Sequence, residues 1–286
     1  MRRKTTAVRI GNVVLSSEEP VLVQSMLNTS TREVDACVEQ AIRIIEAGGR
    51  LVRITAPGVK EAEMLGEIHR RLRERGYTTP ISADIHFVAE AASVAARYVE
   101  KVRINPGNFA DKRATFKKLT YTDEEYAAEL EILRQKFTEF LEVCRQYGTA
   151  VRIGTNHGSL SDRIMSRYGD TPAGMVEATM EYLRVCQACD FKDVVISLKS
   201  SDCRTMVDAV RLLVEKMEAE GMCYPLHLGV TEAGEGEDGR IRSAVGIGTL
   251  LNEGIGDTIR VSLTEEPEAE IPVACELARI CSEPEY

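Results

Sequence analysis

Short apolar runs alternate along the chain with longer segments in which apolar residues recur every three or four positions. The short runs span four to six residues and are rich in Val, Ile and Leu, which is typical of buried parallel strands. Strands are expected at Val21–Ser25, Leu51–Thr55, Ile81–Asp84, Lys101–Asn105, Ala150–Gly154, Asp193–Leu198, Pro225–Gly229 and Thr258–Leu263. Helices are expected at 31–47, 58–75, 87–99, 121–147, 171–189, 202–220, 242–253 and 267–281.

Strict alternation of strands and helices predicts right-handed βαβ units and a parallel sheet. Eight units in a chain of 286 residues match a closed (β/α)8 TIM barrel, whereas the alternative, an open doubly wound sheet, usually ends after five or six strands. Residues 7–15 precede the first unit, and Gly11-Asn12 between two apolar runs predicts a β-hairpin that closes the bottom of the barrel. The segment 109–147 is longer than one helix requires, so the fourth unit carries an insertion or an unusually long helix.

No Pro- or Ser-rich linker divides the chain, which predicts a single domain over residues 1–286. The acidic run Glu235–Asp238 is expected to form a solvated, mobile loop.

Four expected strands carry an arginine between two β-branched residues, where a parallel barrel strand should be apolar. These residues are Arg53, Arg103, Arg152 and Arg260, and Lys199 follows a fifth strand. Because side chains alternate along a strand, flanking Val and Ile residues that face the helices would turn the arginines into the barrel. A buried guanidinium needs either an internal salt bridge, for which Asp84 and Glu232 are available, or a bound anion. The cations outnumber these acids, which favours an anion site, and several planar guanidinium groups suit a diphosphate.

Polar residues follow the strands at the end where barrel enzymes carry their active sites. They include His86, Asn105, Asn156, His157, Glu232 and Ser262. His86 and His157 are expected on loops, where a catalytic role and a solvated one fit the sequence equally well. Asp84, His86, His157 and Glu232 could surround a metal ion, but no ligand spacing such as HExxH supports this, and no metal site is predicted. Lys199 could form a Schiff base, although its cationic neighbours fit phosphate binding as easily.

Composition excludes several classes of protein. The chain has 36 Lys and Arg against 45 Asp and Glu, 44% hydrophobic residues and no Trp, which excludes a disordered, collagen-like or disulfide-stapled protein. No run approaches the ~18 apolar residues of a membrane span, and no signal peptide is visible, so we expect a cytoplasmic protein. The net charge of −9 argues against a nucleic-acid partner. Seven Glu and one Arg within residues 265–286 account for most of this charge.

The eight cysteines indicate reduced thiols in a protein of this length without a secretion signal. Cys186-Gln-Ala-Cys189 is the one CxxC pair and lies in a helical pattern without a second pair. This favours buried helix cysteines over a metal or redox site.

Consecutive motifs over nearly the whole chain match one enzyme family in the right order. They are Val23-Gln-Ser-Met26, Ala83-Asp-Ile-His-Phe87, Val102-Arg-Ile-Asn-Pro-Gly-Asn108, Val151-Arg-Ile-Gly154 with Asn156 and Gly158-Ser-Leu160, Leu226-His-Leu-Gly229 with Thr231-Glu-Ala-Gly234, and Glu253-Gly-Ile-Gly-Asp-Thr258 with Arg260-Val-Ser-Leu263. In these motifs the chain resembles the 4-hydroxy-3-methylbut-2-enyl diphosphate synthases, the iron–sulfur enzymes of the non-mevalonate isoprenoid pathway.

The resemblance implies a barrel similar to dihydropteroate synthase that binds 2-C-methyl-D-erythritol 2,4-cyclodiphosphate at a basic mouth. It gives the diphosphate-binding role to Arg53, Arg103, Arg152, Lys199, Arg260 and Ser262. The further substrate-binding candidates are Asp84, His86, Asn105, Asn156 and His157, and Glu232 resembles the acid near the reacting hydroxyl. The family opens the cyclic diphosphate and removes a hydroxyl with two electrons, which ferredoxin or flavodoxin delivers through a [4Fe-4S] cluster.

The chain departs from the family where the cluster should be bound. The family's cluster ligands, three Cys and a Glu, lie in a C-terminal domain, whereas this chain ends just after the eighth expected helix. We therefore expect a truncated form that binds substrate without turnover and holds no cluster on its own residues. Segment 109–147 is similar to the longer family members, which insert a further domain. The resemblance also implies a homodimer in which the cluster domain of one subunit caps the barrel of the other.

Two other functions remain open at this point. The first is a self-contained transferase of the pterin-binding barrel type, which would bind a pterin diphosphate and turn over without iron. The second is a binding or assembly module whose arginines form structural ion pairs. Diphosphate affinity that is unaffected by Arg103→Ala and Arg260→Ala would favour the module.

Overall fold

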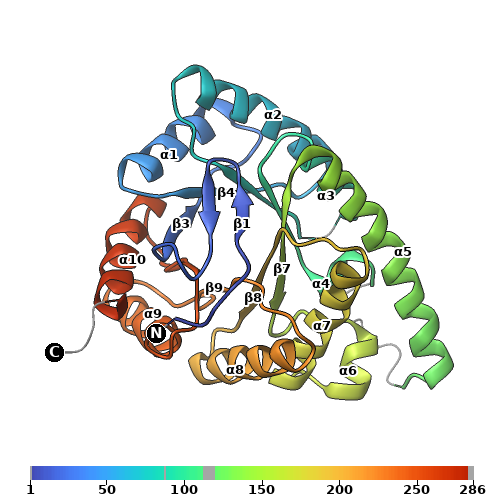
Figure 1. The fold of residues 1–286 in the computed structure, drawn as a ribbon. Helices are drawn as coiled ribbons and strands as arrows, with labels where there is room; N and C mark the ends of the chain where they lie inside the picture. Colours follow the sequence, from blue (N-terminus) through green and yellow to red (C-terminus); the bar gives the residue numbers. More distant parts are fainter. Residues whose placement is uncertain (1, 87, 112–119, 283–286) are drawn as a thin grey trace.

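The computed structural model describes residues 2–86, 88–111 and 120–282 of the 286-residue chain. Its central sheet has eight parallel strands in the order β8-β7-β6-β5-β4-β3-β10-β9, and a bridge between Ile196 and Leu226 joins its two edges (Figure 1). The strands are β3 (Leu22–Met26), β4 (Leu51–Thr55), β5 (Ile81–Asp84), β6 (Lys101–Ile104), β7 (Ala150–Asn156), β8 (Val194–Lys199), β9 (His227–Leu228) and β10 (Thr258–Ile259). The predicted (β/α)8 barrel is confirmed.

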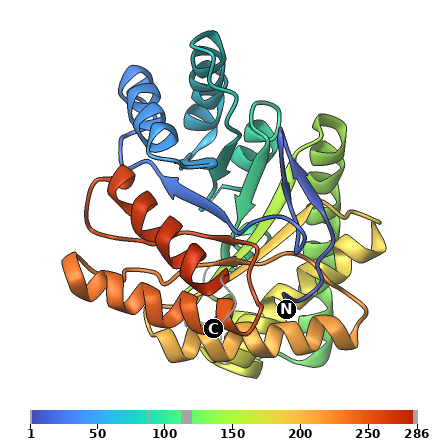
Figure 2. The ribbon, with the colours of Figure 1, turned by 60° about the vertical axis from the view of Figure 1, so that its left-hand side comes forward.

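Helices surround the sheet on its outer side (Figures 1 and 2). They are α1 (Val34–Glu46), α2 (Val59–Glu74), α3 (Ala89–Ala95), α4 (Pro106–Phe109), α5 (Asp123–Tyr147), α6 (Asp162–Tyr168), α7 (Pro172–Ala188), α8 (Cys203–Ala219), α9 (Gly236–Asn252) and α10 (Pro267–Ser282). The sequence pattern missed α4 and α6, which are too short to show helical periodicity. Each begins at a polar cap, Asn105 for α4 and Ser161 for α6. No helix in the described ranges is long and apolar enough to cross a membrane.

The prediction of a loop at Glu235–Asp238 is wrong, because α9 begins six residues earlier than the pattern suggested. Glu235 is the N-cap residue, and Glu237 and Asp238 occupy the first helical turn. Negative side chains at a helix N-terminus interact favourably with the helix dipole, so the acidic run starts the helix.

The predicted hairpin consists of β1 (Val8–Ile10) and β2 (Val13–Leu15). Its apolar side chains form a separate core cluster with Leu22, Leu51, Ala150 and Val195, which lie on barrel strands. Leu22, Leu51 and Ala150 are the first residues of their strands and Val195 is the second, so all four lie at the amino-terminal end of the barrel. The hairpin therefore closes the bottom of the barrel, as expected.

The fourth unit contains an unusually long helix, α5, which is one of the two alternatives expected for residues 109–147. A capping box between Thr122 and Glu125 starts this 25-residue helix, and Gly148 ends it with a left-handed backbone. Phe137 on α5 packs against Tyr182 on α7, with ring centroids 4.8 Å apart. Residues 112–119 of the segment lie outside the described residues.

Strands β9 and β10 are shorter than the predicted runs 225–229 and 258–263. After Arg260 the chain leaves the sheet, and the backbone N–H of Leu263 donates to Glu270 on α10 over 3.1 Å. A side chain of the last helix thus replaces the strand ladder at this point.

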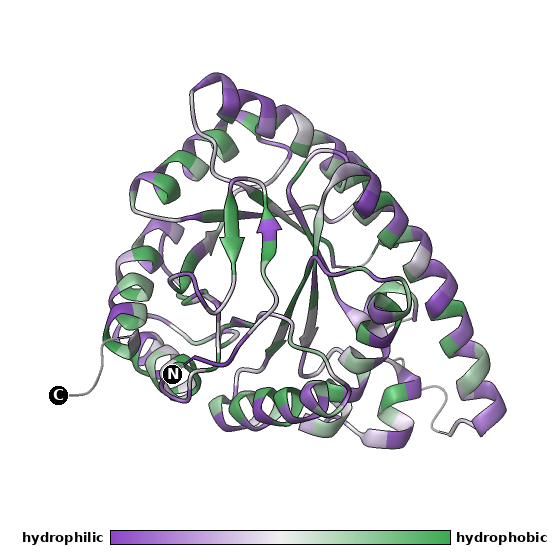
Figure 3. Ribbon diagram, viewed as in Figure 1, coloured by the Kyte–Doolittle hydropathy of each residue, from purple (hydrophilic) through white to green (hydrophobic). Residues whose placement is uncertain are grey.

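The alternation expected for the arginine-bearing strands is confirmed. Val52, Val102 and Val151 belong to the main hydrophobic core between the barrel wall and the helices. The hydropathy colouring shows apolar residues along the strands and polar residues on the outer helix faces (Figure 3). Because neighbours in a strand face opposite sides, the arginines between these residues point into the barrel.

Candidate functional site

Asp84 organises one side of the barrel mouth. It is the only acidic residue within the eight described barrel strands and is fully buried. Its Oδ2 lies 2.7 Å from Arg53 Nη2, and its Oδ1 lies 2.9 Å from Arg103 Nη1. Burial would raise the pKa of Asp84, but Arg53 and Arg103 outweigh that effect and hold the pKa well below its usual value. His86 Nε2 is 3.4 Å from the same Oδ1, so His86 also belongs to this group.

Arg260 pairs with an acid that the sequence reasoning did not identify. Its Nε and Nη2 donate to the two carboxylate oxygens of Glu270 over 3.0 and 2.9 Å. Glu270 lies on α10 and is buried, and it also accepts from Ser25 Oγ over 2.6 Å. A bidentate pair of this kind fixes the plane of the Arg260 guanidinium.

Arg152 and Lys199 have no carboxylate within ion-pair distance among the described residues. Arg152 is 1% exposed, and its Nη1 donates to Ser197 Oγ over 3.2 Å. Burial, and then the positive charges of Arg53 and neighbouring cations, lowers the pKa of Arg152 and of Lys199 well below the usual values. A guanidinium stays protonated even when its pKa is lowered, so at least Arg152 carries a positive charge that no described carboxylate neutralises, which is the electrostatic condition for an anion site.

Two glycines leave the room that these cations occupy. A Cβ at Gly154 would lie 2.6 Å from Arg103 Nε, and a Cβ at Gly229 would lie 2.9 Å from Lys199 Nζ. The carbonyl of Gly154 also accepts from Arg103 Nη2 over 2.8 Å. The absence of a side chain at Gly154 and Gly229 thus leaves the space in which Arg103 and Lys199 lie.

We expect Gly154→Ala to displace the Arg103 guanidinium, because the added methyl group would overlap Nε. The substitution should lower the free energy of unfolding by about 1–3 kcal/mol, as overpacking of a core does. It should also weaken diphosphate binding measurably by isothermal titration calorimetry. Gly248→Ala is the matched control, since its new Cβ would meet only Leu277 and Cys281, at 3.6 Å and beyond. Equal effects of the two substitutions would contradict this role of Gly154.

The candidates Asn105, Asn156 and His157 differ in the contacts that they make. The side chain of Asn105 is occupied locally, because its Oδ1 accepts from Gly107 N and its Nδ2 donates to Ser159 Oγ over 2.9 Å. Asn156, the last residue of β7, pairs in register with Lys199. His157 is exposed and turned toward Asp170, with Nε2 3.5 Å from the carboxylate. Its backbone N–H donates to the carbonyl of Lys199.

Glu232 and Ser262 lie on the loops that follow β9 and β10. Ser262 is half-buried, two residues after Arg260. Glu232 is exposed and has a φ of 53°, in the left-handed region that non-glycine residues rarely adopt. No ion pair of Glu232 occurs among the described residues, so it is not the internal counter-ion that the sequence suggested as one option.

A second set of buried polar residues lies on the barrel strands. It consists of Gln24, Ser82, Lys101 and His227. The sequence analysis did not identify Lys101 and Ser82 as inward-facing residues. Lys101 stands two positions before Arg103, and Ser82 two positions before Asp84, both of which were predicted as site residues. Period-two alternation applied to the whole strand was the signal that could have found them.

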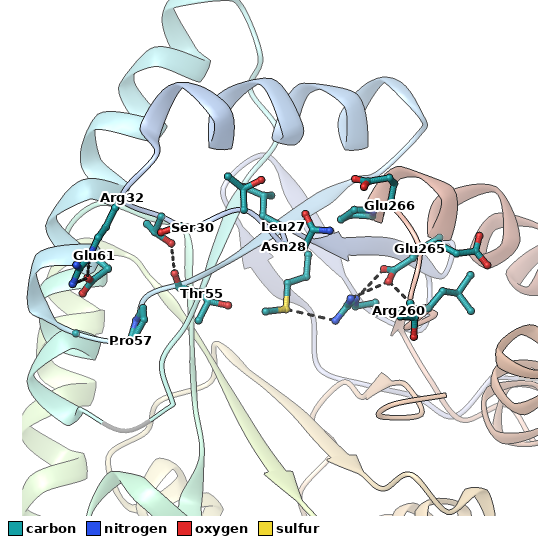
Figure 4. Close-up of a pocket in the computed structure, with 18 residues that line it drawn as sticks. Leu27, Asn28, Ser30, Arg32, Thr55, Pro57, Glu61, Arg260, Glu265 and Glu266 are labelled. Atoms are coloured by element: carbon teal, nitrogen blue, oxygen red, sulfur yellow. Dashed lines mark hydrogen bonds and ion pairs between the residues drawn. The ribbon is translucent and has the colours of Figure 1, made fainter. Parts of the chain in front are cut away.

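A groove opens beside the mouth, between the loops that follow β3, β4 and β10 (Figure 4). Its volume is ≈ 1190 Å³, and Arg260 contributes to its lining. Arg32 and Glu61 form an ion pair of 2.7 Å on the side of the groove away from Arg260 (Figure 4). Arg260 is therefore reachable from solvent through this groove.

The described residues do not fit an iron–sulfur cluster. No group of three or more His, Cys, Asp or Glu within the described ranges is placed to hold a metal ion. Cys37, Cys144 and Cys186 are buried, and burial raises the pKa of Cys37 to about 11, which disfavours the thiolate that a metal requires. Cys186 is buried inside α7, as predicted, whereas Cys189 lies at the C-cap of this helix and is only half-buried.

Comparison with known proteins gives consistent matches over this barrel. A family model described as the GcpE TIM-barrel domain matches residues 5–275. The 4-hydroxy-3-methylbut-2-en-1-yl diphosphate synthase (flavodoxin) of Parabacteroides distasonis is 64% identical over 96% of this chain and 45% of that protein. The chloroplastic 4-hydroxy-3-methylbut-2-en-1-yl diphosphate synthase (ferredoxin) of Arabidopsis thaliana is 52% identical over 98% of this chain and 38% of that protein. The chain thus spans less than half the length of these relatives.

Among solved structures, dihydropteroate synthase from Yersinia pestis has a TM-score of 0.59 at 14% identity. The match covers 97% of this chain and 99% of that chain. At this identity the likeness shows a shared fold, which agrees with the expected similarity to dihydropteroate synthase.

Proposed function

The chain belongs to the family described as the GcpE TIM-barrel domain, and from this we propose that it is the substrate-binding barrel of a 4-hydroxy-3-methylbut-2-en-1-yl diphosphate synthase of the bacterial cytoplasm. In this proposal the barrel binds 2-C-methyl-D-erythritol 2,4-cyclodiphosphate with the diphosphate in the cationic mouth. The observation that carries it is the pair of buried cations, Arg152 and Lys199, without a carboxylate partner among the described residues.

The arginines that already have acidic partners can still donate to a diphosphate. Arg53 uses Nη2 for Asp84, while its Nε and Nη1 have no hydrogen-bond partner in the described structure. Arg260 uses Nε and Nη2 for Glu270, while its Nη1 lies 3.5 Å from Met26 Sδ. The acids thus orient guanidinium groups whose remaining N–H bonds are available to an anion, so binding would not require these ion pairs to break.

Glu232 is proposed as the acid near the reacting hydroxyl, as the resemblance implies. Its loop follows β9 at the carboxyl end of the barrel, where barrel enzymes place reacting groups. Its left-handed backbone costs on the order of 1 kcal/mol and indicates a conformation imposed by the surrounding loop.

The redox step belongs to the whole protein. The names of the relatives indicate flavodoxin or ferredoxin as the electron donor, and the reaction the family carries out needs two electrons. The described cysteines do not fit a cluster, so the roles proposed for the residues of this chain are binding and proton transfer. A cluster held elsewhere in the full-length protein, and a homodimer that brings it to the barrel, are parts of the proposal that rest on the resemblance.

The pterin-binding transferase is not favoured. The relatives that are more than 50% identical to this chain over the aligned residues are named as diphosphate synthases, whereas the Yersinia pestis dihydropteroate synthase shares the fold at 14% identity.

The proposal is tested by titrating the chain with the cyclodiphosphate and, separately, with a pterin diphosphate by calorimetry. We expect binding of the cyclodiphosphate and at least a roughly tenfold loss of affinity in Lys199→Met, because a desolvated charge contact is removed. Lys192→Met is the matched control, because Lys192 has 71% of its side chain exposed and lies outside the barrel. Failure of the unaltered chain to bind the cyclodiphosphate, or preference for the pterin, would overturn the proposal.

A further inference from the structure

Lys101 is a buried amine for which the proposed binding site has no assigned use. It begins β6, is fully buried, and its Nζ has no hydrogen-bond partner in the described structure. Its register neighbours are Ser82 on β5 and Ala150 on β7. Ser82 Oγ is likewise buried without a partner. An ammonium group in such surroundings loses its hydration without gaining hydrogen bonds in return.

The charges around Lys101 make the ammonium form still less favourable. Arg53 on β4 and Arg152 on β7 are the cations that act on it most strongly, and Asp84 on β5 opposes them. Asp84 is already paired with Arg53 and Arg103. Burial first, and then Arg152 and Arg53, lowers the pKa of Lys101 well below its usual value.

The remaining strands add no acid to this environment. Lys199 on β8 ends near the mouth, and β9 contributes His227, which is fully buried. The groups from β3 and β10 are the neutral Gln24 and Thr258, and Gln24 Nε2 lies 3.0 Å from His227 Nδ1 and 2.7 Å from Thr258 Oγ1. Every charged group that the described strands turn toward Lys101 is therefore a cation, apart from Asp84.

We propose that Lys101 is an uncharged amine in the empty barrel and takes up a proton when a doubly charged anion occupies the mouth, so that substrate binding is coupled to proton uptake. The inference rests on the proposed function for the identity of that anion, the cyclodiphosphate. The anion neutralises the cations above Lys101, and this removes the repulsion that opposed its charge. The proton comes from solvent, and no bond is made or broken in the ligand.

The sign of the resulting pH dependence follows from linkage. The complex holds one more proton than the free chain. Affinity therefore falls as the pH rises from the pKa of Lys101 in the empty barrel to its higher pKa in the occupied barrel. Within that window the dissociation constant rises by up to about tenfold per pH unit. The cyclodiphosphate cannot cause this slope, because each of its phosphorus atoms carries only a strongly acidic oxygen.

Calorimetry in several buffers of different ionisation enthalpy, at about pH 7.5, measures the protons taken up per ligand bound. We expect up to about one proton for the unaltered chain and for the control Lys192→Met. Lys101→Met should bind the ligand with little or no proton uptake. The empty variant should melt at a higher temperature, because a buried amine without a hydrogen-bond partner is replaced by an apolar side chain of similar size. His227→Asn should retain the uptake. Binding without proton uptake in the unaltered chain, or uptake that survives in Lys101→Met, would overturn the inference.

A second measurement separates this inference from the proposed function. Carbon-13 resonances of the lysine Cε atoms report the charge of each amine, and the Lys101 resonance is assigned by its absence from Lys101→Arg. We expect an uncharged amine in the empty chain and a charged one at saturation. The same titration is repeated with sulfate, a dianion that has no proton titrating near neutrality. If sulfate charges Lys101 while the cyclodiphosphate does not bind, the proposed function fails and the inference stands; a Lys101 already charged in the empty chain overturns the inference alone.

Discussion

Replacing Arg152 by methionine is expected to weaken binding of the cyclodiphosphate by about 2–5 kcal/mol, as loss of a desolvated charge contact does. The same substitution should make the empty chain more stable by about 1–4 kcal/mol, because a buried charge is replaced by an apolar side chain of similar size. Arg152 is the residue in which these two effects oppose each other most clearly. It is 1% exposed, donates to Ser197 Oγ, and has an Nε without a partner among the described residues.

Calorimetric titration measures the binding effect, and urea unfolding measures the stability effect. Arg9→Met is the matched control, since Arg9 is exposed on β1 at the closed bottom of the barrel and should alter neither quantity much. A variant that is both less stable and unaltered in affinity would show that Arg152 serves the fold, as the assembly-module alternative requires.

Replacing Asp84 by asparagine is expected to have the opposite effect on stability. Loss of the Asp84 carboxylate should lower the free energy of unfolding by about 3–5 kcal/mol, which is typical when one partner of a buried ion pair is removed. Arg53 and Arg103 would keep their charges without the carboxylate that they share, at 2.7 and 2.9 Å. Because Arg152 and Lys199 already lack carboxylate partners, the barrel interior of this variant would be more strongly positive still.

Urea unfolding at neutral pH checks this effect, with Asp193→Asn as the control at an exposed position just before β8. The double variant Asp84→Asn with Arg103→Met should recover part of the loss, because one unpaired cation is removed with the acid. A loss below about 1 kcal/mol in the single variant would mean that water, and not Asp84, balances the two arginines.

The pH dependence of this pair has a definite sign. The native pKa of Asp84 is held well below the unfolded value of about 3.9, so its contribution to stability is fully present above that value. The contribution is lost as the pH falls through the native pKa. The Asp84→Asn chain should therefore lose less stability than the unaltered chain between neutral and acidic pH.

Strand alternation explains why much of the site could be predicted. The direction of a side chain in a strand depends on local backbone geometry, so Val52-Arg53-Ile54 already indicates an inward arginine. The same reasoning holds for Arg103 and Arg152, whose neighbours face the helices. Lys101 was missed because it begins its strand, where the flanking pattern gives no second apolar neighbour.

The partners of these arginines could not be predicted, because they come from elements far apart in the chain. Glu270, on a helix that the sequence assigns to the outer layer, meets Arg260 only where β10 ends early and α10 docks against the barrel. Glu232, which the sequence offered as an internal counter-ion, is instead exposed on its loop. A carboxylate and a guanidinium pair according to distances across the closed barrel, which depend on the stagger of the strands.

The sequence by itself therefore determined the eight-unit barrel, the hairpin at its bottom and the inward direction of the charged strand residues, because these follow from local periodicity. Only the tertiary structure decided which cations are neutralised. Asp84 holds Arg53 and Arg103, Glu270 holds Arg260, and Arg152, Lys199 and Lys101 have no carboxylate partner among the described residues. Charge balance in a barrel is a property of side chains brought together by closure, so it appears only once the eight strands are in place.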